Sequence, residues 1–182
     1  MLKRLISRLP GKQNTLKVFG TAAFIVYGWT IYESFWKVPS WIYFLKLSEI
    51  FSIYAYSFLV NFVESVLLIL GLIFVNFFLS SNLWKDSFSS ASVAMLVILV
   101  GSAILHLRLY ENPNLRASFI DSQLRWWSVT VFFAFVASYI CVRISWLRRS
   151  LENLADRFVV FLYIYIPLTI LSFGIVIVRA VL

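Results

Sequence analysis

The stretch YAYSFLVNFVESVLLILGLIFVNFFL, residues 54–79, decides the fold of this chain. It is 26 residues long and carries a single charged side chain, Glu64. A helix of that length extends for about 39 Å, which exceeds the roughly 30 Å thickness of the hydrocarbon core of a bilayer. The stretch therefore predicts a transmembrane helix.

Glu64 is the polar residue that most constrains this helix. An ionised carboxylate at the centre of a membrane costs at least about 2.5 kcal/mol on insertion scales, so Glu64 is expected to face protein rather than lipid. Ser57, Asn61 and Gly71 fall at helical spacing from Glu64 and predict one shared, buried face. The expected partner of the carboxylate is Asn61 or a basic group from another apolar run. The candidate buried polar residues are Ser57, Asn61, Glu64, His106, Arg108 and Arg125.

Two interpretations of Glu64 stay open. In a structural role the carboxylate ties two helices together, whereas in a channel or transporter it carries protons or ions. The structural role is favoured, because a relay needs several intramembrane acids and the predicted spans contain few of them.

Composition places the whole chain in the membrane class. Hydrophobic residues make up 62% and charged residues 13% of the sequence, against about 45–50% and about 25% in a soluble domain. The mean hydropathy is +0.89. Because no polar stretch is long enough to fold separately, residues 1–182 are expected to form a single transmembrane domain.

Five apolar runs predict five transmembrane helices in a polytopic, all-α protein. The predicted spans cover residues 18–36, 54–79, 91–109, 126–145 and 158–178. Short interfacial helices are expected over residues 41–52 and 112–124, where charged and aromatic residues interrupt the apolar ones. Pro167 lies near the middle of the fifth span and is expected to kink it.

Basic residues, which give a net charge of +8, gather at the ends of the apolar runs. Segment 1–17 is basic and free of acids, and predicts an amphipathic helix bound to anionic lipid headgroups. Lysine and arginine are in excess in the segments on the same side of the membrane as the N-terminus, which predicts a cytoplasmic N-terminus. The expected location is the plasma (bacterial inner) membrane. The basic start fits the mitochondrial inner membrane as an alternative. No nucleic acid partner is expected, because the membrane surface accounts for the charge.

Small residues recur on one face of the fourth run and predict close helix packing. They are Ala134, Ser138 and Cys141. The stripe also favours a homo-oligomer or a hetero-complex. The connector that follows carries Arg148, Arg149 and Glu152. It is a candidate cytoplasmic docking site or, alternatively, a solvated face that enforces the topology.

Aromatic residues inside the predicted spans fit two uses. They either line a pocket for lipid or another apolar ligand, or they pack between helices, and the sequence leaves both open. These residues are Tyr27, Trp29, Tyr54, Tyr56, Tyr163 and Tyr165.

The chain lacks the groupings on which membrane enzymes depend. Cys141 is the only cysteine and His106 the only histidine, which excludes an internal disulfide and bis-histidine haem ligation within one chain. Ser102 lies one helical turn before His106, but no Gly-x-Ser-x-Gly turn accompanies the pair. No enzyme activity, cofactor or metal is expected.

These patterns favour a non-catalytic small integral membrane subunit that assembles with itself or with partner proteins. One alternative is a channel or transporter of ions or small molecules that uses Glu64. Another is a membrane sensor or effector of a multi-gene system such as antiviral defence. A transporter requires a continuous polar path, whereas an assembly subunit requires packing stripes and charged connectors.

Overall fold

The computed structural model describes residues 10–78, 87–111 and 122–181. This part of the chain forms six α-helices, which are α2 (Lys12–Phe44), α3 (Leu47–Phe78), α5 (Phe88–Glu111), α7 (Gln123–Arg143), α8 (Ser145–Val159) and α9 (Leu162–Val181). The predicted all-α class is therefore confirmed for the described residues. Most of the basic segment 1–17 and of the expected interfacial helix 112–124 lies outside them.

Four helices are long and apolar enough to cross a membrane, which supports a multi-pass membrane protein. They are α3, α5, α7 and α9. Helix α2 covers the first predicted span, but its composition leaves it outside this group. Its buried face carries Gly20, Thr21 and Ser34, small or polar residues that lower the hydropathy of the helix. The predicted count of five spans is thus not confirmed by composition.

Helix boundaries differ from the predictions at two places. Residues 41–52 do not form a separate interfacial helix, because α2 continues through Pro39 to Phe44 and α3 begins at Leu47. The fifth predicted span is divided, since residues 158–159 end α8 and a turn at residues 160–161 precedes α9. The turn separates the charged, amphipathic α8 from the apolar α9, so the two helices can take different directions.

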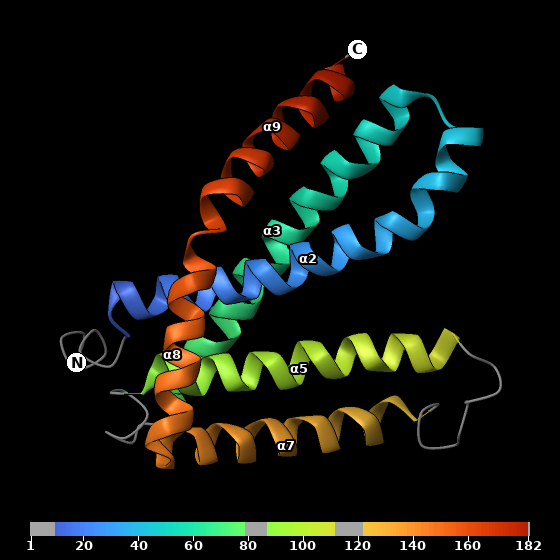
Figure 1. Ribbon diagram of the computed structural model, residues 1–182. Helices are drawn as coiled ribbons and strands as arrows, with labels where there is room; N and C mark the ends of the chain where they lie inside the picture. The colour runs from blue at the N-terminus through green and yellow to red at the C-terminus, as the bar shows by residue number, and fades with distance from the viewer. Residues whose placement is uncertain (1–9, 79–86, 112–121, 182) are drawn as a thin grey trace.

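The helices pack as two groups, and α2 contacts both of them. Figure 1 shows α5 and α7 as an antiparallel pair, while α3 runs beside α9 and crosses α2. Helix α8 runs across α2, α5 and α7, contacts all three, and leads into α9.

The core lies where α8 crosses the bundle. Every residue from Ser87 to Leu96, at the start of α5, is buried, because α2, α7 and α8 all pack against this helix. Ala155 of α8 is fully buried in the same cluster. At Gly20 of α2 an added Cβ would lie 3.0 Å from the Val159 Cα atom, so the α2–α8 crossing depends on a residue without a side chain.

Candidate functional site

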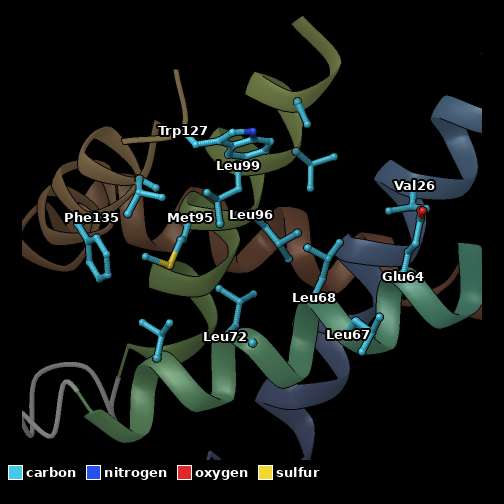
Figure 2. Close-up of a pocket in the computed structure, with 16 residues that line it drawn as sticks. Val26, Glu64, Leu67, Leu68, Leu72, Met95, Leu96, Leu99, Trp127 and Phe135 are labelled. Carbon is cyan, nitrogen blue, oxygen red and sulfur yellow. The ribbon is translucent and has the colours of Figure 1, made fainter. Parts of the chain in front are cut away.

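A groove between α3 and the α5–α7 pair opens on the apolar surface of the described chain. Helix α3 diverges from the α5–α7 pair (Figure 1), and the space between them has a volume of about 600 Å³. Figure 2 shows side chains from α2, α3, α5 and α7 around it. Residues that line the groove include Val26, Glu64, Leu68, Leu72, Met95, Leu96, Leu99, Trp127 and Phe135.

Glu64 is the charged residue of this lining. Its side chain extends into the groove beside Val26 (Figure 2), and the remaining lining residues are aliphatic, aromatic, glycine or methionine. Among the described residues, the carboxylate of Glu64 forms no ion pair or hydrogen bond. The groove therefore combines an apolar surface with one carboxylate that lacks a partner within the described chain.

The expected burial of Glu64 on the face of Asn61 is wrong for the single chain. Asn61 is buried, but Glu64 is exposed. Three residues turn a helix by about 300°, which leaves Glu64 roughly 60° away from Asn61. That difference directs Asn61 toward α2 and Glu64 toward the groove. Gly71 lies on the side of Glu64 and also lines the groove.

Asn61 has a different polar partner from the expected one. The Thr30 hydroxyl of α2 donates a hydrogen bond to Asn61 Oδ1 at 3.0 Å. The buried Asn61 Nδ2 has no partner in the described part of the chain. Ser57 is half-buried, and its hydroxyl donates to the Ile53 carbonyl of its own helix at 2.8 Å. The predicted polar residues of α3 therefore lie on two neighbouring faces of the helix: Asn61 faces α2, and Glu64 faces the groove.

The three basic candidates do not reach Glu64. The Arg108 guanidinium pairs with the Glu33 carboxylate of α2 and lies 5.1 Å from the centre of the Trp29 ring. His106 is buried with its ring centre 4.9 Å from that of Trp126. Arg125 is exposed near the start of α7. Sequence reasoning missed Glu33 as the partner of Arg108. The signal was available, because Glu33 ends the first apolar run and Arg108 ends the third, so both lie near the same membrane surface in the predicted topology.

The small-residue stripe of α7 faces α5. Ala134, Ser138 and Cys141 are all buried, and the Ser138 hydroxyl donates a hydrogen bond to the Ala91 carbonyl at 2.8 Å. The stripe thus packs within the chain, against α5, and is not exposed for contact with another protein.

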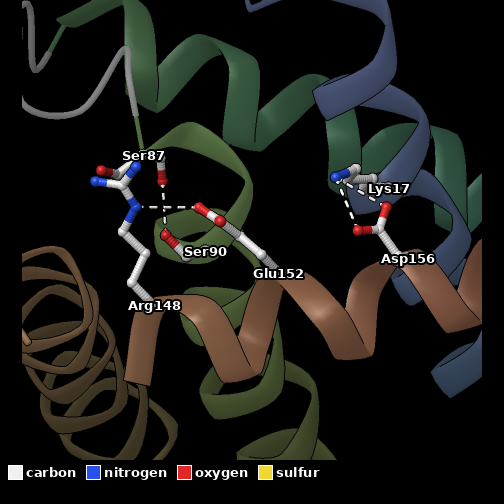
Figure 3. A network of polar contacts seen from close by, with 6 residues as sticks. All are labelled: Lys17, Ser87, Ser90, Arg148, Glu152 and Asp156. Atoms are coloured by element: carbon white, nitrogen blue, oxygen red, sulfur yellow. Dashed lines mark hydrogen bonds and ion pairs between the residues drawn. The ribbon is translucent and has the colours of Figure 1, made fainter. Parts of the chain in front are cut away.

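The charged connector is largely engaged within the fold. Arg148 Nε and Glu152 Oε1 are 3.2 Å apart in α8, and Figure 3 shows this pair beside Ser87 and Ser90 at the start of α5. Lys17 of α2 pairs with Asp156 of α8 at 2.8 Å (Figure 3). Arg149 is the exposed member of the three candidate docking residues, so the connector presents a smaller charged surface than the sequence suggested.

No family model, curated protein or solved structure matches this chain. Within the described ranges, no group of three or more His, Cys, Asp or Glu side chains is placed to hold a metal ion. The Glu64 groove is therefore the candidate site that rests most directly on the structure.

Proposed function

We propose that this chain is a non-catalytic integral membrane subunit whose Glu64 groove receives a transmembrane helix of a different protein. The observation that carries the proposal is the exposed carboxylate in an otherwise apolar groove between candidate transmembrane helices. Left against lipid, an ionised carboxylate costs at least about 2.5 kcal/mol. A basic or hydrogen-bonding side chain on a partner helix removes that cost.

The depth of Glu64 supports a helix as the occupant. Helix α3 has 32 residues, and Glu64 lies near its middle, more than 20 Å from either end at about 1.5 Å per residue. A lipid headgroup stays at the membrane surface and does not reach this depth. A transmembrane helix carries side chains at every depth of the membrane.

Charge complementarity favours a different protein over a second copy. The basic residues of the described chain lie toward helix ends or in the crosswise α8. A second copy would therefore bring apolar side chains, and no basic group, to the middle of the groove. A partner with a lysine, arginine or amide side chain in mid-span complements the carboxylate.

Gly71 supports close approach of the partner backbone. It lies about two helical turns from Glu64 in the same groove, and an added Cβ there would meet nothing within 4 Å. Glycine at such a position lets two transmembrane helices pack closely. Because the space is open in this chain, a larger residue at Gly71 obstructs a partner without disturbing the fold.

We also propose that α2 crosses the membrane, which gives five spans with the N-terminus in the cytoplasm. The support is its length of 33 residues and its packing against α3, α5 and α8. The bias of basic residues toward the N-terminal side fits the plasma (bacterial inner) membrane, with the mitochondrial inner membrane as the alternative.

Gly71→Leu tests the partner site, with Gly174→Leu as its matched control. Gly174 is exposed on α9, and an added Cβ also meets nothing there. Wild type and Gly174→Leu are expected to co-purify with one membrane protein in fixed ratio, whereas Gly71→Leu and Glu64→Leu lose it. A photocrosslinker at Leu67 in the groove should capture a mid-span segment of that protein, and one at Phe132 on α7 should not.

Three results would contradict the proposal. The first is a free monomer in native mass spectrometry of wild type purified in mild detergent. The second is a Leu67 crosslink to this same chain, which would make a second copy the occupant. The third is a wild type that conducts ions in proteoliposomes and loses only this flux in Glu64→Gln, which would identify a channel or transporter.

A further inference from the structure

A second pocket lies where α2 and α3 approach their common turn. It has a volume of about 320 Å³ and contains both a carboxylate and an ammonium group among aromatic rings. Its lining includes Trp29, Glu33, Lys37, Trp41, Tyr54 and Ser57. The charged and aromatic residues stand at the ends of the apolar runs, which is the depth of lipid headgroups. The pocket is separate from the Glu64 groove.

The pocket offers a ligand the ammonium group of Lys37 and one carboxylate oxygen of Glu33. Glu33 holds Arg108 through Oε1, which leaves Oε2 as a further acceptor. Lys37 is exposed and has no ion-pair partner among the described residues. The two side chains project from one face of α2, a single helical turn apart. They match a ligand in which a negative and a positive group lie a few ångströms apart.

The aromatic residues suit the positive group of such a ligand. The Trp41 and Tyr54 rings meet edge to face with centres 6.1 Å apart. Trp29 also lines the pocket, and the Arg108 guanidinium lies 5.1 Å from its ring centre. Arg108, which does not line the pocket, therefore helps to position the Trp29 ring. Aromatic faces attract ammonium groups, tryptophan most strongly.

We infer that this pocket binds the headgroup of a zwitterionic phospholipid, with its phosphate at Lys37 and its ammonium group near Glu33 and the aromatic rings. A phosphate accepts charge-assisted hydrogen bonds from a lysine. An anionic phospholipid without an ammonium group fits less well, because it offers no donor to Glu33 Oε2 and no cation to the aromatic rings. The inference concerns this chain alone and does not depend on the protein that occupies the Glu64 groove.

Lipid titration of the detergent-purified chain, followed by native mass spectrometry, tests the inference. Short-chain phosphatidylethanolamine and phosphatidylcholine are compared with phosphatidylglycerol. The variants are Lys37→Gln and Trp41→Leu, with Lys46→Gln as control, since Lys46 lies at the same turn but outside the pocket. Thermal unfolding of each variant verifies that the fold is intact.

Wild type and Lys46→Gln are expected to bind one zwitterionic lipid more tightly than phosphatidylglycerol. Lys37→Gln is expected to weaken that binding by about tenfold, the usual effect of losing a charge-assisted hydrogen bond. Equal weakening by Lys37→Gln and Lys46→Gln would overturn the inference in favour of general surface charge. Preference for phosphatidylglycerol, or displacement of the lipid by inorganic phosphate alone, would overturn it in favour of an anion site.

Discussion

At the scale of single residues, Tyr27 is the polar group on which three helices converge. Its side chain is fully buried, its hydroxyl lies 2.6 Å from the Thr169 hydroxyl of α9, and it donates to the Phe58 carbonyl of α3 at 3.1 Å. The Tyr27 and Tyr165 rings stack with centres 4.6 Å apart. The sequence left open whether Tyr27 lines a ligand pocket or packs between helices, and the structure shows packing between helices.

Tyr27→Phe is expected to lower the free energy of unfolding by about 0.5–1.5 kcal/mol, because the ring remains while the hydroxyl contacts are lost. Thermal unfolding in detergent measures the change. Tyr163→Phe is the control, since Tyr163 is 81% exposed on α9. An equal loss of stability in the two variants would show that the hydrogen bonds of the buried Tyr27 hydroxyl do not contribute to the free energy of unfolding.

At the scale of helices, α2 and α8 cross at close range, and α2 also packs against both groups of helices. Gly20 permits the backbones to touch at Val159, and the Lys17–Asp156 pair lies near the same crossing. The pair is partly exposed, so its own contribution is at most about 1 kcal/mol. The steric fit at Gly20 is the stronger constraint.

Gly20→Ala is expected to destabilise the fold by about 1–3 kcal/mol, since the new methyl group pushes α8 away from α2. Gly28→Ala in the same helix has open space around the added Cβ and should leave stability unchanged or slightly raised. Unfolding of the two variants under identical detergent conditions measures the difference. If Gly20→Ala is as stable as Gly28→Ala, the crossing does not depend on close backbone contact.

At the scale of the whole molecule, the side of the membrane on which each helix end lies distinguishes five spans from four. Single cysteines at Gln13, Ser40 and Asn153, all exposed positions, are introduced into a Cys141→Ala background. Five spans place Gln13 and Asn153 on the cytoplasmic side and Ser40 on the other. Labelling with a membrane-impermeant maleimide should therefore separate Ser40 from the other two positions. Labelling of Gln13 and Ser40 from the same side would leave α2 on the membrane surface.

The helices themselves could be read from the chain, since apolar runs in lipid must satisfy their own backbone hydrogen bonds and a helix does so locally. The Ala134, Ser138 and Cys141 stripe was equally visible, because its spacing alone puts the three residues on one face. The division between α8 and α9 was not, because Phe158 and Val159 are as apolar as the residues that follow. In the structure the backbone of these two residues lies against Gly20 of α2.

The rotation of α3 is the feature on which the candidate site depends, and it arises from packing between helices. Both the groove side and the lipid side of α3 are apolar, so hydrophobic periodicity cannot distinguish them. The Thr30–Asn61 hydrogen bond fits a rotation that turns Asn61 toward α2. Helix geometry fixes the angle between Asn61 and Glu64. The neighbouring helices fix how α3 is rotated, and with Asn61 turned toward α2 the Glu64 side chain lies at the groove.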